Sequence, residues 1–281
     1  MEKLSILFLS CLIISFSACS QNPVTTADCS NNHYRDSLVE HYIRNGAEKL
    51  PDSYNNPRWG LYCDSVLMVC PNTAEAYQLK AIPSLKGGDY ETAFRLNDKA
   101  VELEPRNYLD YRAFLKCIFT KDYNGSITDF KEAEKLSPKG GLMDHSYSFF
   151  IGLCYMELGR YQDAEEYFKK DITMQTGGDS LQLPHFNSLF YTGLLYYRMS
   201  QFSKAKKYLE DCVGVYEQHP EANYYLAMIA GQEGNKAQKI RYLDIAKKAL
   251  RNGYRLNEDN IYYANYPGQI TIHEISNALQ P

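Results

Sequence analysis

Small residues recur in this chain at one fixed set of distances, and that recurrence limits the possible folds more than any other feature. Gly152 is followed by Gly159 after seven residues, by Ala164 after twelve and by Asp171 after nineteen. The stretches on either side of Gly159 carry apolar residues at spacings of three and four, as one face of an α-helix requires. A small residue on each helix lets two antiparallel backbones approach closely. Residues 145–172 are therefore predicted to form a helical hairpin.

Copies of this frame recur along most of the chain. Three further copies begin at Ala81, Gly193 and Ala227, and two degenerate copies begin at Ala47 and Phe114. The step from Ala47 to Ala81 is 34 residues, and the step from Gly193 to Ala227 is 34 again. Copies in one register predict a stack of helix pairs, because each pair must bury its apolar face against a neighbour.

The recurring frame resembles that of the tetratricopeptide repeat family, in which helix-turn-helix units of about 34 residues stack into a right-handed superhelix. The resemblance covers roughly residues 36–252. It implies an all-α fold, an α-solenoid of about six such repeats, which we place at residues 34–252. Residues 253–281 leave the frame and end in a short amphipathic helix around Ile275. We expect this segment to cap the last apolar face of the solenoid.

Two kinds of feature interrupt the frame. Pro83 lies inside a predicted first helix and should kink that helix or mark a shifted boundary. Insertions at 139–144 and 176–185 are expected to project as loops from one edge, because a solenoid accommodates loops without disturbing its stack.

The first 18 residues read as an export signal rather than as part of the fold. The apolar run Leu4–Phe16 is shorter than the roughly 20 residues of a membrane span and fits the core of a secretory signal peptide. It leads into the sequence FSAC, which is similar to the lipobox of bacterial lipoproteins, although a leucine is usual where Phe16 stands. We expect residues 1–18 to be a lipoprotein signal peptide, Cys19 to be lipidated and residues 19–33 to form a flexible tether. The alternatives are an ordinary cleaved signal and a buried first helix.

The residues after Cys19 bear on location. Ser20 stands where, by resemblance to the known sorting rule, an aspartate would argue for retention in the inner membrane. The acidic run associated with surface display is absent from residues 20–23. We therefore expect a protein of the bacterial cell envelope that is lipid-anchored in the outer membrane and faces the periplasm.

Charge and cysteine content limit the partners and the cross-links. The net charge is −4 without a basic stripe, so we expect no nucleic-acid partner. Six cysteines remain after Cys19, and no CxxC pair occurs. Cys63 and Cys70 would lie about 10.5 Å apart on one helix, too far for a disulfide. We favour small buried hydrophobes over a disulfide framework, although export would permit bridges.

Patterns that catalysis or metal binding would require are missing. The six histidines form no HxxxH or HExxH pair, and no GxSxG elbow or phosphate-binding loop occurs. Repeat packing accounts for almost every residue. The sequence therefore favours a protein that is not an enzyme and has no catalytic residues, no metal, no cofactor and no small-molecule substrate.

The resemblance places partner binding on the concave face, which the first helix of each repeat lines in this family. Transferring the family's inward positions one residue at a time gives an aromatic and apolar groove. Its residues are Tyr108, Tyr111, Leu115, Phe149, Leu153, Met156, Phe190, Leu194, Tyr197, Tyr224 and Met228. The lysine and asparagine with which chaperone-binding members hold a C-terminal carboxylate are absent at the matching positions. In the alternative interpretation, the C-terminal segment or a tight superhelical turn fills the groove.

An exposed apolar groove with aromatic anchors is typical of a binding site. We therefore expect a non-catalytic, membrane-anchored interaction module of the cell envelope that binds a peptide or protein partner in this groove. The alternative is an immunity-type lipoprotein that neutralises a toxin in the periplasm, which the anchor, the small size and the two edge loops motivate.

Overall fold

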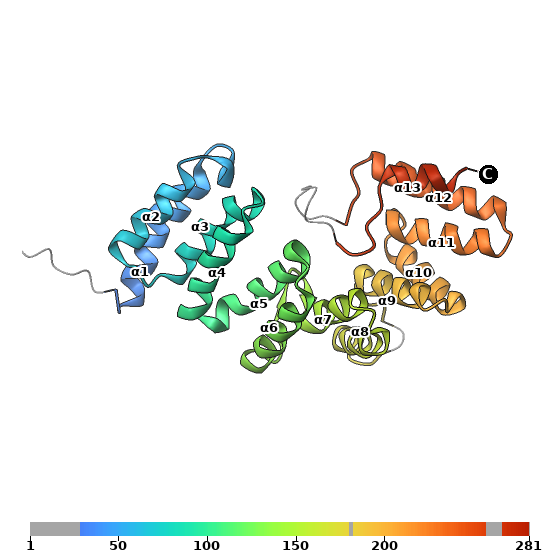
Figure 1. Cartoon of the computed structure of the whole chain (residues 1–281), viewed down its shortest axis with the longest axis horizontal. Helices are drawn as coiled ribbons and strands as arrows, with labels where there is room; N and C mark the ends of the chain where they lie inside the picture. Colours follow the sequence, from blue (N-terminus) through green and yellow to red (C-terminus); the bar gives the residue numbers. More distant parts are fainter. Residues whose placement is uncertain (1–28, 180–181, 257–265, 281) are drawn as a thin grey trace, which may run out of the picture.

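The computed structural model describes residues 29–179, 182–256 and 266–280. The expected signal peptide, the lipidation site Cys19 and most of the expected tether lie outside these residues. The described part is a curved stack of helices with α1 at one end and α13 at the other (Figure 1). Among these helices, none is both long enough and apolar enough to cross a membrane.

Five regular helix pairs follow one irregular unit. The pairs are α3 (Ala74–Lys86) with α4 (Tyr90–Leu103), α5 (Pro105–Leu115) with α6 (Tyr123–Leu136), α7 (Tyr147–Glu157) with α8 (Tyr161–Thr176), α9 (Phe186–Arg198) with α10 (Phe202–Val215), and α11 (Pro220–Gln232) with α12 (Lys236–Arg251). The first unit contains α1 (Asn32–Val39), the π-helical turn η1 (Glu40–Arg44), the 3-10 turns η2 (Ala47–Lys49) and η3 (Ser53–Asn55), and α2 (Trp59–Val69). A π-helical turn η4 (Lys116–Thr120) extends α5, and α13 (Ile272–Ala278) closes the chain. The predicted all-α solenoid of six units with a C-terminal capping helix is confirmed.

The position seven residues into the frame has a left-handed backbone, which explains why the sequence repeats there. The φ angle is +84° at Gly88, +71° at Gly159 and +76° at Gly234. Lys121 and Ser200 occupy the same position in two other copies, and φ is 58° at each. A residue with a Cβ atom adopts this conformation at a cost of about 1–2 kcal/mol, whereas glycine adopts it without that cost. The frame is thus a backbone requirement of the turn between paired helices.

Pro83 neither ends α3 nor shifts its boundary, because the helix continues through it to Lys86. Proline has no N–H, so the carbonyl oxygen four residues earlier, on Leu79, loses its helical partner. Trp59 of α2 donates its Nε1–H to that oxygen at 2.8 Å. The tryptophan thereby fixes α2 against the proline turn of α3.

The two expected insertions lie between helix pairs. Residues 139–144 contain β1 (Gly141–Leu142), which pairs in an antiparallel manner with β2 (His145–Ser146) just before α7. The second insertion, residues 176–185, lies between α8 and α9 and falls partly outside the described residues.

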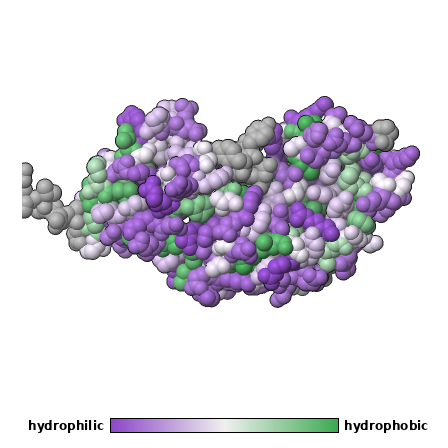
Figure 2. Space-filling view, viewed as in Figure 1, coloured by the Kyte–Doolittle hydropathy of each residue, from purple (hydrophilic) through white to green (hydrophobic). Residues whose placement is uncertain are grey.

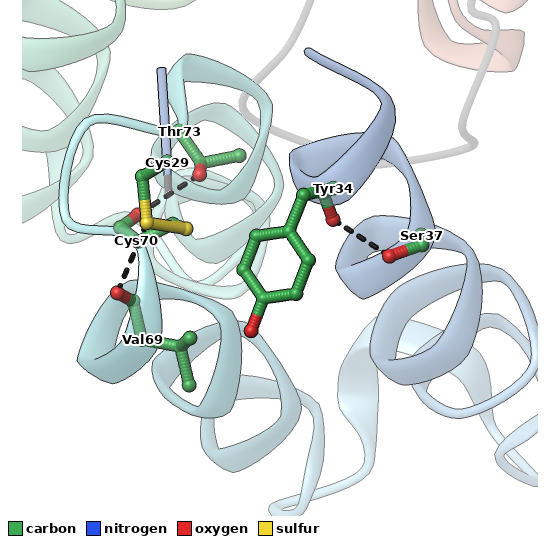
Figure 3. The surroundings of a disulfide bond; sticks show 6 residues. All are labelled: Cys29, Tyr34, Ser37, Val69, Cys70 and Thr73. Carbon is green, nitrogen blue, oxygen red and sulfur yellow. Dashed lines mark hydrogen bonds between the residues drawn. A yellow bond between two sulfur atoms is a disulfide. The ribbon is translucent and has the colours of Figure 1, made fainter. Parts of the chain in front are cut away.

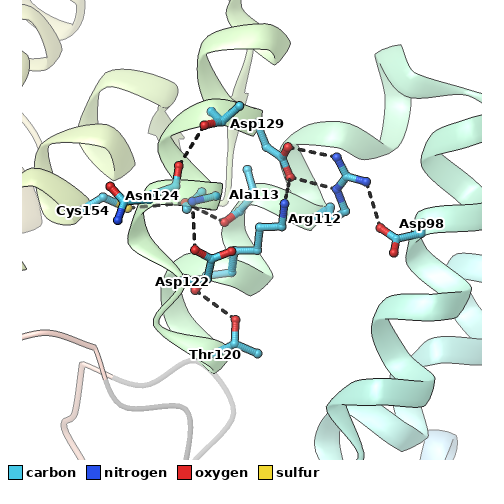
Figure 4. A network of polar contacts seen from close by, with 12 residues as sticks. Asp98, Arg112, Ala113, Thr120, Asp122, Asn124, Asp129 and Cys154 are labelled. Atoms are coloured by element: carbon cyan, nitrogen blue, oxygen red, sulfur yellow. Dashed lines mark hydrogen bonds and ion pairs between the residues drawn. The ribbon is translucent and has the colours of Figure 1, made fainter.

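A partly buried ion-pair network joins three consecutive helices, α4, α5 and α6 (Figure 4). Arg112 donates from Nε and Nη2 to the two carboxylate oxygens of Asp129 at 2.8 and 2.9 Å, and from Nη1 to Asp98 at 2.8 Å. Lys116 Nζ lies 2.8 Å from Asp129 Oδ2, and the Asp129 side chain is 9% exposed. The two cations offset the cost of burying this carboxylate, so loss of either one would leave its charge under-compensated.

A disulfide joins Cys29 to Cys70, with 5.5 Å between the two Cα atoms. It links the segment before α1 to the end of α2 (Figure 3), where Thr73 Oγ1 donates to the Cys70 carbonyl oxygen at 2.9 Å. The expectation of buried thiols was wrong for this pair, which is 41 residues apart and so gives no local spacing signal. Four other cysteines are free and buried, as expected: Cys63, Cys117, Cys154 and Cys212.

Replacing both Cys29 and Cys70 with serine should lower the free energy of unfolding by about 4 kcal/mol, because the cross-link restricts the unfolded chain. Urea titration measures the change. Reductant should destabilise the wild-type protein by a similar amount and leave the double variant unchanged. Equal urea midpoints for the wild type and the double variant would contradict a disulfide in the native protein.

Candidate functional site

More than half of the residues predicted to line the groove are buried. Six of them are at most 1% exposed: Leu115, Phe149, Leu153, Met156, Phe190 and Leu194. The other five are partly exposed: Tyr108, Tyr111, Tyr197, Tyr224 and Met228. The face seen in Figure 2 is largely hydrophilic, with small apolar patches. Most of the apolar inner surface is therefore packed inside the protein.

The C-terminal segment covers part of this inner surface. A Cβ atom on Gly268 would lie 2.4 Å from Leu194 Cδ2 and 3.7 Å from Phe190 Cζ, so the backbone of the segment rests directly on these two side chains. Gly268 also has a φ of +72°. Glycine is thus required there both for the close approach and for the backbone conformation. At α9, the structure therefore matches the alternative interpretation, in which the C-terminal segment fills the groove.

The same segment covers the last helix pair. Ile270 and Ile275 form a buried cluster with residues of α11 and α12, against which Tyr224 and Met228 also pack. The backbone N–H of Ile270 donates to Glu221 Oε1 at 3.4 Å. Partner binding by the buried groove residues stays a prediction. At α9 and α11 such binding requires the C-terminal segment to move away from the apolar side chains that it covers.

A row of histidines stands at the beginnings of α7, α9 and α11. His185 Nδ1 accepts the N–H of Asn187, and His219 Nδ1 accepts the N–H of Ala222, both at 3.2 Å. Each of these two rings therefore carries its proton on Nε2. The rings of His145 and His185 are 4.9 Å apart, with an edge-to-face geometry.

The histidine row is neutral at pH 7. Burial lowers the pKa of His145 and of His219 to about 3, with a smaller repulsion from His185 acting on both. Burial also lowers the pKa of His185. None of these histidines is among the predicted site residues. The distance from His185 to His219 in the sequence is 34 residues, the repeat period, and this could have pointed to the row.

A pocket of about 330 Å³ opens beside this row, at the N-terminal ends of α9 and α11. Residues after α12 complete its wall. Its lining residues are Phe186, Asn187, Tyr216, His219, Pro220, Glu221, Arg255, Leu256 and Tyr266. The pocket combines aromatic rings, amide, imidazole and carboxyl groups, and one guanidinium.

Glu221 is the least expected residue of the pocket, because its side chain is completely buried. Burial raises the pKa of its carboxyl to about 7, although two backbone N–H groups act in the opposite direction. His219 Nδ1 lies 3.5 Å from Glu221 Oε2. This is not an ion pair, because His219 is neutral and its Nδ1 already accepts a hydrogen bond. Glu221 thus has no cationic partner within the described protein.

Three buried polar atoms of the pocket residues have no hydrogen-bond partner in the described protein. They are Asn187 Oδ1, His219 Nε2 and Glu221 Oε2. Buried polar groups in native proteins are nearly always paired, so each such group calls for an explanation. The pocket residues hold three of the seven such atoms in the described part of the chain; the other four belong to His145, Ser148, Tyr191 and Gln269.

Comparisons with known proteins identify the repeat itself. Two family models described as tetratricopeptide repeats match residues 145–175 and 187–219, which correspond to the pairs α7–α8 and α9–α10. No curated protein matches the chain.

Solved structures with the same fold extend over most of the chain. The crystal structure of PilW, a widely conserved type IV pilus biogenesis factor, is 14% identical, with a TM-score of 0.63, and the match covers 88% of this chain and 98% of PilW. Pseudomonas aeruginosa PilF is 18% identical, with a TM-score of 0.60 and coverage of 78% and 94%. Yeast Tom70 is 17% identical, with a TM-score of 0.55, and the match covers 87% of this chain but 46% of Tom70. Residues 145–175 and 187–219 are thus identified as tetratricopeptide repeats, and the repeat frame, the helix pairs and the solved structures show that the chain has the fold of a tetratricopeptide-repeat solenoid.

Proposed function

We propose that the protein is a lipid-anchored interaction module of the bacterial cell envelope, which binds a peptide or protein partner on the concave face of its solenoid. The observation that carries the proposal is the apolar inner surface of α9 and α11, on which the C-terminal segment lies in the place of a bound peptide. A surface that already holds a non-helical stretch of its own chain, which turns at Gly268, has the apolar character to hold a segment of another chain.

Two further observations support the envelope location. The Cys29–Cys70 disulfide fits a protein that is exported to an oxidising compartment. The structural neighbour PilW is a type IV pilus biogenesis factor, and it shares the fold over 98% of its length. The lipobox-like sequence before Cys19 supplies the anchor in this proposal.

A pull-down from native membranes after crosslinking tests the proposal. Phe149 and Phe190 are unsuitable probes, because both are fully buried and their truncation would destabilise the fold. The better test replaces Tyr197 and Tyr224 together with serine, since both are partly exposed on the inner helices. The matched control is Ile240→Ser on α12, which removes a side chain that is 58% exposed.

We expect one specific envelope protein to co-purify with the wild type and with the Ile240→Ser variant, but not with the Tyr197→Ser, Tyr224→Ser double variant. The Cys19→Ala variant should leave the membrane fraction. A partner that the double variant retains would exclude this face as its binding surface. A single secreted toxin as the captured protein would favour the immunity-type alternative instead.

A further inference from the structure

The pocket beside the histidine row has a chemistry that peptide binding on the concave face does not use. Its aromatic rings lie close together: Phe186 and Tyr216 have ring centroids 4.9 Å apart, and Phe186 and His219 are 5.9 Å apart. Its volume of about 330 Å³ is at the low end of the range for small-molecule sites. A ligand that fits must be small and must have an apolar part.

The unpaired polar atoms specify the rest of the ligand. Asn187 Oδ1 and the ionised form of Glu221 Oε2 are acceptors, so they require a group that donates hydrogen bonds, and a cationic donor beside Glu221 would favour its ionised form. His219 Nε2 carries a proton, because Nδ1 accepts from Ala222, so it requires an acceptor. Arg255 is exposed at the pocket, and none of the ion pairs within the described protein involves it. The pocket therefore offers two groups that need a hydrogen-bond donor, from Glu221 and Asn187, and two groups that need an acceptor, from His219 and Arg255.

We propose that this pocket binds a zwitterionic α-amino acid with an apolar or aromatic side chain. Its ammonium group lies at Glu221 Oε2 and Asn187 Oδ1, and its carboxylate meets His219 Nε2–H and the Arg255 guanidinium. Its side chain lies among Phe186, Tyr216 and Tyr266. The inference goes beyond partner binding on the concave face and departs from the expectation that the protein has no small-molecule ligand.

Other ligand classes match the pocket less completely. A simple anion would face the buried carboxyl of Glu221, and a simple cation would leave His219 Nε2–H unpaired beside Arg255. A metal ion lacks its ligands, because no group of three His, Cys, Asp or Glu side chains in the described part of the chain is placed to hold one. A molecule with both charges pairs all of the groups at once.

Isothermal titration calorimetry of the purified, dialysed full-length mature protein tests the inference. The probes are L-phenylalanine, L-tyrosine, L-leucine, L-isoleucine, L-methionine and L-valine, and N-acetyl-L-phenylalaninamide serves as the analogue without either charge. The Arg255→Gln variant removes the cation from an exposed position and should fold normally. Glu221→Gln keeps the shape of the buried group, and Arg251→Gln is the matched control, because Arg251 is exposed and does not line the pocket.

We expect saturable binding of at least one of these amino acids and at least tenfold weaker binding of the uncharged analogue. Arg255→Gln and Glu221→Gln should each weaken the binding at least tenfold, whereas Arg251→Gln should not change it. Absence of binding by all six amino acids would overturn the inference, as would equal binding of the uncharged analogue or unchanged binding by Arg255→Gln. The pull-down described above uses different variants, so the two proposals fail independently.

Discussion

Replacing Gly152 with leucine should lower the free energy of unfolding by about 3 kcal/mol or more, because it overpacks the contact between α7 and α8. Even a Cβ atom at this position would lie 2.8 Å from Cδ1 and Cε1 of Phe168. Phe168 cannot withdraw, because its side chain is fully buried and packs near Phe149, with ring centroids 6.4 Å apart. Thermal and urea unfolding measure the loss.

The chain offers a matched partner and a matched control for this change. Gly193→Leu should have a similar effect, since a Cβ atom there would lie 2.8 Å from Leu209 Cγ across the contact of α9 with α10. Gly214 also lies in a helix, α10, but a Cβ atom would meet nothing within 4 Å. Gly214→Leu should therefore stabilise the protein by up to about 1 kcal/mol, because leucine favours a helix more than glycine does. Equal stability of Gly152→Leu and the wild type would show that the small residue does not set the helix contact.

The repeat frame could be predicted from the sequence because each of its positions has a local physical cause. Gly152 permits close approach to Phe168, and Gly159 permits the left-handed turn that follows. Such requirements act within one hairpin, so they leave the same signature in each repeat. Lys121 and Ser200 weaken the signature in two copies, and the left-handed turn persists there because packing of the flanking helices overrides the local cost.

The candidate site was less predictable, because it depends on contacts between distant parts of the chain. The resemblance to the repeat family predicts inward positions for Phe190 and Leu194, but the segment that covers them comes after the last repeat and matches no repeat position. The disulfide between Cys29 and Cys70 likewise joins the tether to the first repeat. The pocket needs α9, α11 and the segment after α12 together, so no single stretch of sequence encodes it.

Acidification should destabilise the protein strongly, because the native state holds buried neutral histidines. The pKa of His145 and of His219 is lowered to about 3, against 6.5 for an unperturbed histidine. Their contribution to stability is therefore complete above pH 6.5 and is lost as the pH falls towards 3. Glu221 acts in the opposite direction, because its raised pKa of about 7 costs stability as the pH rises above 4.5. Each unit of pKa shift corresponds to about 1.4 kcal/mol. By pH 3.5 the two histidines should lower the free energy of unfolding by about 8 kcal/mol relative to pH 7, and Glu221 should raise it by about 3 kcal/mol, so the net loss is about 5 kcal/mol.

The slope of stability against pH separates these contributions. Between pH 5 and 6, His145, His219 and Glu221 together make the unfolded wild type bind about one proton more than the native state. The free energy of unfolding should therefore fall by about 1.4 kcal/mol for each unit by which the pH is lowered. Glu221→Gln removes the opposing carboxyl and should raise the uptake to nearly two protons. His145→Phe keeps an aromatic ring against Phe149, whose ring centroid lies 3.9 Å from that of His145, and should reduce the combined uptake of His219 and Glu221 to near zero. Burial of His185 adds an uptake of the same sign in all three proteins. Urea titrations at several pH values give these slopes, and a His145→Phe slope equal to that of the wild type would mean that His145 is not held neutral by burial in the native protein.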